Sequence, residues 1–124
     1  MSYKNLEVWQ SAKDVEQEIR SMVLEEIPKF DMWKEGTELR RASKYVIAGI
    51  VEATGKRGNK QNFIKCLKSS VESNTEAIGH LRALFGSGAL TDTVFFEGLL
   101  AKMKIVDEQL HAFIQTVERE HPKK

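Results

Sequence analysis

The sequence predicts an all-α protein, an antiparallel up-down-up-down four-helix bundle, in which residues 1–124 form a single domain. Three observations lead to this prediction. Apolar residues recur at intervals of three and four in four long segments, no segment alternates as a strand would, and the connecting segments are short. Short connections favour antiparallel packing of consecutive helices. A chain of 124 residues is long enough for one hydrophobic core but not for two.

The first two helices are expected at about 5–27 and 37–54. Pro28 is expected to stop the first, because its ring cannot continue a helix. Gly36 and Thr37 suit the start of the second, where a threonine hydroxyl can accept an unpaired backbone N–H. The apolar positions of the first are Leu6, Trp9, Ala12, Val15, Ile19, Met22 and Val23. Those of the second are Leu39, Ala42, Val46, Ile47, Ile50 and Ala53.

The third and fourth helices are expected at about 60–85 and 92–119, with turns at 55–59 and 86–88 that glycines mark. The stripe of the third is Phe63, Ile64, Leu67, Val71, Ile78, Leu81, Leu84 and Phe85. The seam of the fourth has the three-four spacing of a helix bundle. Its members are Phe96, Leu99, Met103, Val106, Leu110, Phe113 and Val117.

The fourth helix also carries apolar residues beside its seam, namely Phe95, Leu100, Ile105 and Ile114. They indicate either a wide core face or a second surface that packs against another subunit, because large exposed apolar patches usually mark contacts. The pattern leaves both open.

The composition is that of an ordinary globular protein, with 41% hydrophobic and 30% charged residues. Cys66 is the single cysteine, which excludes an internal disulfide and favours a reducing compartment. The first residues lack an apolar signal region, and no apolar run approaches the roughly 18 residues of a membrane span. We therefore expect a cytoplasmic protein.

Charge is sorted along the chain although the net charge is only +1. Residues 40–68 hold eight basic residues and one acidic residue, Glu52, for a local charge of +7. Residues 1–39 carry −4 and residues 69–124 carry −2. A local field of this kind steers anionic partners even when the total charge is near zero.

The basic segment is a candidate phosphate-binding site, since clustered cations bind nucleic acid by releasing counterions. The alternative is a solvated face with ion pairs, in which Arg41 pairs inward with Glu52 or Glu72. No aromatic interleaving typical of single-strand readers is evident, so weak sequence specificity is expected. The candidate nucleic-acid-binding residues are Arg40, Lys44, Lys56, Arg57, Lys60, Lys65 and Lys68.

Catalytic and metal chemistry are not predicted. Glu108 with His111, and Glu118 with His121, have the spacing used in di-iron bundles. Both pairs lie on one helix, however, whereas a di-iron site needs such pairs on two. Cys66 has no histidine spaced to activate it, and no residue set supplies a nucleophile, a base and an orienting group. We expect no cofactor and no enzyme activity.

Several motifs resemble the four-helix-bundle proteins encoded within 23S ribosomal RNA intervening sequences. The stretch 5–12, Asn-Leu-Glu-Val-Trp-Gln-Ser-Ala, resembles the opening of that family, and 39–42, Leu-Arg-Arg-Ala, resembles its second helix. The likeness covers about residues 4–84 and weakens in the last helix. Further matches are Ile50, Glu52, Phe63, Ile64 and Leu67. Where the family has Ser, Pro, Asn and Gly, this chain has Tyr45, Ile47, Gly49 and Ala53.

The resemblance implies a bundle that forms homo-oligomers. The family is also similar to the accessory proteins of diversity-generating retroelements, which form homopentamers and associate with a reverse transcriptase and nucleic acid. The resemblance thus implies a homo-oligomer such as a homopentamer, with a reverse transcriptase as a further partner.

Together, these features predict a non-catalytic accessory protein that binds RNA, DNA or a reverse-transcriptase-type partner through its basic surface. The alternative is a protein–protein interaction scaffold that does not bind nucleic acid. Both remain open, because one bundle architecture can serve unrelated functions.

Overall fold

The computed structural model describes residues 3–27 and 33–120. A short 3-10 turn, Tyr3–Asn5, precedes helix α1, Glu7–Glu26. Helices α2, Trp33–Thr54, α3, Lys60–Gly86, and α4, Thr93–Glu120, follow. The described part of the chain contains no strand, which confirms the all-α prediction of four helices.

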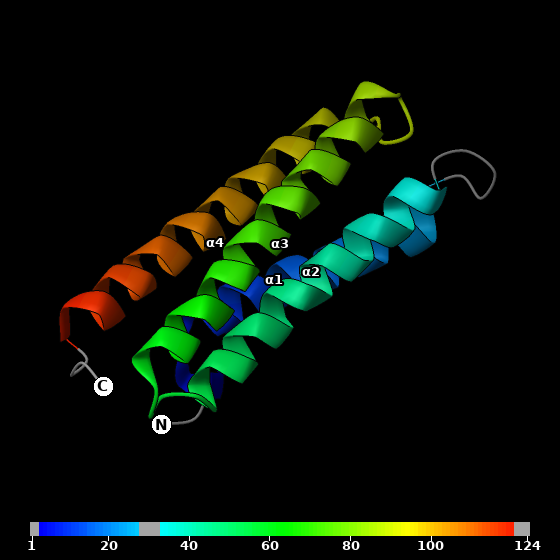
Figure 1. Ribbon diagram of the computed structural model, residues 1–124. Coiled ribbons are helices and arrows are strands. Elements are labelled where there is room, and N and C mark those ends of the chain that lie inside the picture. Colours follow the sequence, from blue (N-terminus) through cyan, green and yellow to red (C-terminus); the bar gives the residue numbers. More distant parts are fainter. Residues whose placement is uncertain (1–2, 28–32, 121–124) are drawn as a thin grey trace.

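The four helices lie side by side, and each contacts two neighbours (Figure 1). Helix α1 contacts α2 and α4, and α3 contacts the same two helices, with the most extensive interface between α2 and α3. Contacts between α3 and α4 run in opposite order along the two helices. Lys60 and Asn74 of α3, for example, bond to Glu118 and Met103 of α4, respectively.

Side chains at the loops define where two of the helices begin. The Oδ1 atom of Asn59 accepts a hydrogen bond from the Asn62 backbone N–H at 3.0 Å, which caps α3. The Oδ1 atom of Asp92 accepts from the Phe95 N–H at 3.0 Å at the start of α4. Between these helices, Gly88 has a φ of 86°, a left-handed conformation that favours glycine.

Two predicted helix ends are corrected. Helix α2 begins at Trp33 and not at Thr37, so Gly36 lies inside the helix. A Cβ atom on Gly36 would lie 3.0 Å from Cγ1 of Val23, so the glycine permits close approach of α1 and α2. Helix α1 ends at Glu26, and Ile27 is extended, as expected for a residue that precedes proline. Pro28 itself lies outside the described residues.

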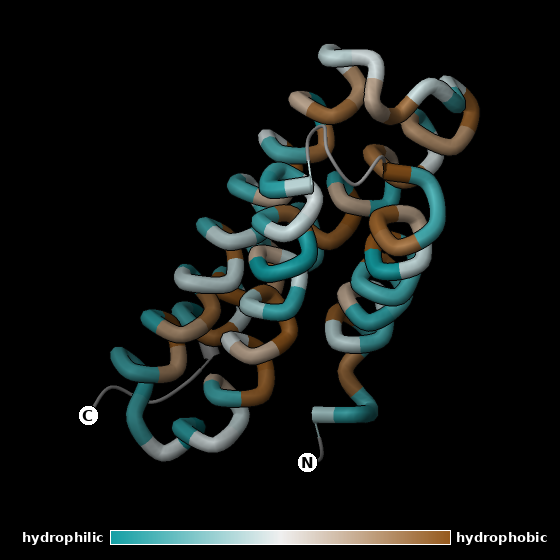
Figure 2. Tube along the Cα trace, turned by 90° about the vertical axis from the view of Figure 1, so that its right-hand side faces the viewer, coloured by the Kyte–Doolittle hydropathy of each residue, from teal (hydrophilic) through white to brown (hydrophobic). Residues whose placement is uncertain are grey.

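The predicted stripes supply the core. Hydrophobic positions recur at about every turn of each helix (Figure 2), and the fully buried set includes Ile19, Leu39, Ile50, Leu67, Leu81 and Leu110. The four apolar residues beside the α4 seam, expected either in a wide core face or on a subunit contact, differ in burial. Ile114 is buried in the core, Phe95 and Leu100 are half-buried, and Ile105 is exposed. The core face of α4 is therefore wide, and Ile105 alone of the four is exposed.

Buried polar side chains link α3 to its neighbours. The Ser70 hydroxyl donates to the Val46 carbonyl of α2 at 2.8 Å, and the Asn74 side-chain amide donates to the Met103 carbonyl of α4 at 2.9 Å. Because buried polar groups are costly without partners, these bonds favour one alignment of the helices over others. No helix in the described ranges has the length and apolar character needed to cross a membrane.

Candidate nucleic-acid interface

The cations of α2 form a stripe on its outer side. Arg40, Arg41 and Lys44 follow Thr37 at the spacing of one helix face, and together with Tyr45 they line an open hollow of about 330 Å³. Arg41 and Lys44 are exposed, whereas Arg40 is half-buried. This stripe presents cations to solvent along the first half of α2.

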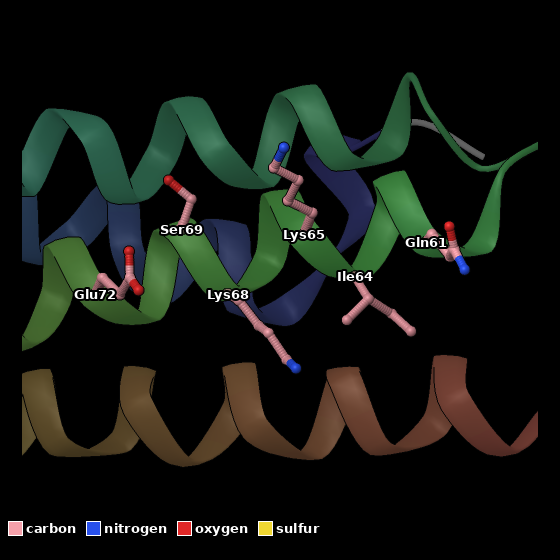
Figure 3. Close-up of a pocket in the computed structure, with 6 residues that line it drawn as sticks. All are labelled: Gln61, Ile64, Lys65, Lys68, Ser69 and Glu72. Atoms are coloured by element: carbon pink, nitrogen blue, oxygen red, sulfur yellow. The ribbon is translucent and has the colours of Figure 1, made fainter.

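A second stripe runs along the first half of α3 and lines an open hollow of about 570 Å³ (Figure 3). Lys65 and Ser69 point toward α2, while Ile64 and Lys68 point toward α4. Both lysines are exposed. Glu72 closes the stripe at its far end, so the positive charge is concentrated at Lys65 and Lys68.

The two stripes lie at neighbouring levels of the bundle. The hydrogen bond from Ser70 to Val46 fixes the alignment of α2 and α3. Val46 pairs with Ser70, whereas the later residue Gly49 also meets the earlier residue Cys66. This order of contacts puts Lys44 and Lys68 about 6 Å apart along the bundle axis. We call Arg41, Lys44, Lys65 and Lys68 the basic face; all four side chains are exposed.

The turn between α2 and α3 carries the remaining predicted cations. Lys56 is exposed, and Arg57 and Lys60 are half-buried. The Lys60 ammonium donates to the Glu118 carbonyl at 2.7 Å, close to the end of α4. A cation there satisfies a terminal carbonyl and opposes the negative end of the helix dipole. Lys60 therefore links two helix ends, a long-range role that periodicity could not reveal.

Arg40, and not Arg41 as expected, is the partly buried arginine of α2. Arg41 is exposed and forms no ion pair with Glu52 or Glu72, so the predicted inward pair is wrong. Arg40 is the partly buried residue, and its Nε atom lies out of solvent without a hydrogen-bond partner. The reason is geometric: Arg40 lies one turn after Gly36, on the side of α2 that packs against α1.

An exposed aromatic ring lies among these cations and was missed in the sequence. Tyr45 lines the α2 hollow beside Arg41 and Lys44, and 56% of the residue is exposed. The helical spacing could have found it, because Tyr45 lies one turn after Arg41. The expectation of a basic segment without aromatic residues is therefore wrong at this position.

Comparison with known proteins agrees with the resemblance. The family described as 23S rRNA-intervening sequence protein matches residues 4–112. The chain belongs to this family. The match extends beyond the expected limit near residue 84 and includes most of α4. No curated protein matches the chain.

Two groups in this family member bear on catalysis. Burial raises the pKa of the Cys66 thiol, and the nearby Glu52 carboxylate raises it further, so the thiol stays protonated near neutral pH. His80 contacts the Glu35 carboxylate across the α2–α3 interface, a pairing that the sequence analysis did not foresee. The protonated thiol is the weakly nucleophilic form of Cys66.

The Glu-x-x-His pairs do not assemble a metal site within residues 3–27 and 33–120. His111 lies 3.4 Å from the Asp107 carboxylate, one turn away on the same helix. No group of three or more metal-ligating side chains occurs in these ranges. His121, the partner expected for Glu118, lies outside the described residues.

Proposed function

We propose that this chain is a non-catalytic, cytoplasmic accessory protein, an antiparallel up-down-up-down bundle, that binds nucleic-acid phosphates through the basic face. The observation that carries the proposal is the position of Lys44, Lys65 and Lys68. All three are exposed on adjacent helices, within a segment of charge +7 in a chain of net charge +1. Cations gathered in this way neutralise phosphates and release counterions.

The first test is a fluorescence-anisotropy titration of a structured RNA and a DNA duplex at about 50 and 200 mM salt. Binding should weaken steeply as salt rises, because each neutralised phosphate releases a counterion. Lys44→Glu, Lys65→Glu and Lys68→Glu together should abolish it.

A matched control reverses three exposed cations elsewhere, Lys34, Arg82 and Lys104, with the same change in net charge. This control should lose much less affinity than the basic-face variant. Equal losses would show a general charge effect and contradict the site. Absence of binding by the unaltered protein at the lower salt concentration would overturn the proposal.

A second candidate function is a protein–protein scaffold, which one observation favours. Leu24, Trp33 and Val94 are 65%, 59% and 82% exposed, and they lie where α1 ends and where α2 and α4 begin. Exposed apolar residues gathered in one region are typical of contact surfaces. Salt-insensitive binding to a protein, with none to nucleic acid, would favour this function.

The remaining proposals concern partners. From the resemblance we propose self-association, with a homopentamer as the expected assembly, and association with a reverse-transcriptase-type enzyme. Co-purification of the chain with such an enzyme, before and after nuclease treatment, separates direct contact from tethering by nucleic acid. Loss of the complex after nuclease treatment would contradict direct contact.

A further inference from the structure

Among the aromatic residues of the described ranges, Trp33 and Tyr45 are exposed, and of these two Tyr45 lines a hollow together with cations. Phe63 is buried, and Phe85 and Phe96 stack on each other. Tyr45 instead is 56% exposed and shares its hollow with Arg41 and Lys44. Ordering a large ring at the surface gains little for folding, since burial is the main stabilising contribution of aromatic side chains.

The neighbourhood of Tyr45 on α3 follows from the alignment of the helices. Val46, the next residue, is buried and accepts the hydrogen bond from Ser70. Tyr45 and Ser69 therefore lie at nearly the same level, on the exposed edges of the α2–α3 interface. Ser69 points toward α2, as does Lys65 (Figure 3). An exposed ring beside Arg41 and Lys44 on α2 therefore lies level with a hydroxyl on the side of α3 that is turned toward α2.

We propose that Tyr45 is a stacking platform for an unpaired base, and that the ligand is single-stranded nucleic acid or an unpaired stretch in a folded RNA. This inference rests on the proposed function and names the class of ligand. The ring stacks on the base, while Lys44 and Lys65 neutralise phosphates on either side. Base–aromatic stacking between neutralised phosphates is how proteins hold single strands.

The same geometry disfavours stacking on a regular duplex. Bases inside a duplex are already stacked on their neighbours and expose only their edges in the grooves. Stacking on Tyr45 needs a base with a free face, and a single strand or loop supplies one. Because every base has an aromatic face, the site should tolerate many sequences.

The test compares short fluorescein-labelled uridine and adenosine oligonucleotides, their DNA counterparts and a duplex, each titrated with the whole chain at one salt concentration. Tyr45→Ala should weaken single-strand binding roughly fivefold to a hundredfold and leave duplex affinity and the salt dependence unchanged. Tyr45→Phe keeps the ring and should retain single-strand affinity. Ile105→Ala removes an exposed apolar side chain outside the basic face and should leave the affinity for every probe unchanged.

The outcomes separate this inference from the proposed function. If the triple lysine variant loses binding but Tyr45→Ala keeps full single-strand affinity, phosphate binding stands and stacking is overturned. If Tyr45→Ala weakens duplex and single strand equally, its effect is not stacking, and the inference also fails. If the unaltered chain binds none of the probes, both proposals fail together.

Discussion

Gly49 lies at the α2–α3 interface, where a side chain would have no room. A Cβ atom there would lie 2.1 Å from the Ser70 Oγ and 3.0 Å from the Cys66 backbone oxygen. Ser70 cannot move freely, because its hydroxyl donates to the Val46 carbonyl. We expect Gly49→Ala to destabilise the fold by about 1–3 kcal/mol through overpacking, measured by urea unfolding followed by circular dichroism.

Gly79 supplies the control for that measurement. It lies within α3, is exposed, and a Cβ atom built on it would meet nothing within 4 Å. Gly79→Ala should stabilise the fold by about 0.5–1 kcal/mol, because alanine loses less backbone entropy in a helix. Destabilisation by both alanines would contradict the assignment of the Gly49 effect to the contact with Ser70.

A second prediction for a single residue concerns Cys66 and the pH dependence of folding stability. Its thiol pKa is raised in the folded chain, first by burial and then by Glu52. The folded protein therefore holds the thiol proton above the pH at which the unfolded chain releases it, so unfolding becomes easier as pH rises through the unfolded pKa. We expect stability to fall more in the unaltered chain than in Cys66→Ser as pH rises through that range.

Thiol reactivity checks the same shift independently. A disulfide reagent should modify Cys66 more slowly in the folded chain than in the urea-unfolded chain, because the thiolate is the reactive form. Equal rates at mildly alkaline pH would contradict the raised pKa.

At the scale of the element, the cations of the α2–α3 turn and of the α3 stripe should behave differently. Lys60 donates to the Glu118 carbonyl, whereas Lys65 is exposed on the basic face. Lys65→Gln should therefore reduce the salt slope of nucleic-acid binding by about 1. Lys60→Gln should lower stability and leave that slope nearly unchanged. If Lys60→Gln reduced the salt slope as much as Lys65→Gln does, Lys60 would also have to bind a phosphate.

The helices themselves were largely predictable because three-four periodicity reports which side of a helix is buried. Helix α3 begins at Lys60 as expected, and the end of α2 at Thr54 is also confirmed. The expected start of α2 at Thr37 is wrong. Gly36 indicates a helix boundary by residue type, but it lies inside the helix, where it makes room for Val23 of α1. Local residue types indicate helix ends, but contacts between helices decide the ambiguous ones.

The candidate site was likewise predictable where it depends on one helix and not where it depends on contacts between helices. The exposure of Lys44, Lys65 and Lys68 follows from their place opposite the apolar stripes. The partial burial of Arg40 depends on α1, and the bond of Lys60 depends on α4, which is 58 residues away. Both depend on how helices pair, so the periodicity of a single helix cannot predict them. Tyr45 was within reach of the pattern and was overlooked.

At the scale of the whole molecule, the basic face and the exposed apolar residues at one end of the bundle, Leu24, Trp33 and Val94, occupy different regions. The basic face lies along α2 and α3, while α1 presents Asp14, Glu18, Glu25 and Glu26 along an acidic hollow. Lys102 of α4 binds Asp14 and Glu18 in that hollow, at 3.2 Å from Asp14. A nucleic acid should therefore approach by the α2–α3 side and be repelled from α1. Assembly through the apolar region would leave the basic face accessible.

That separation leads to a prediction about assembly. Leu24, Trp33 and Val94 are exposed, so replacing each with serine should change the stability of the monomer little. If copies associate through them, the serine variant should dissociate toward the monomer mass of 14.1 kDa, measured by size-exclusion chromatography with light scattering. Ile105→Ser, on the flank of α4, is the control and should leave the assembly intact. An unaltered chain of monomer mass at every concentration would overturn self-association, and an assembled serine variant would place the contact elsewhere.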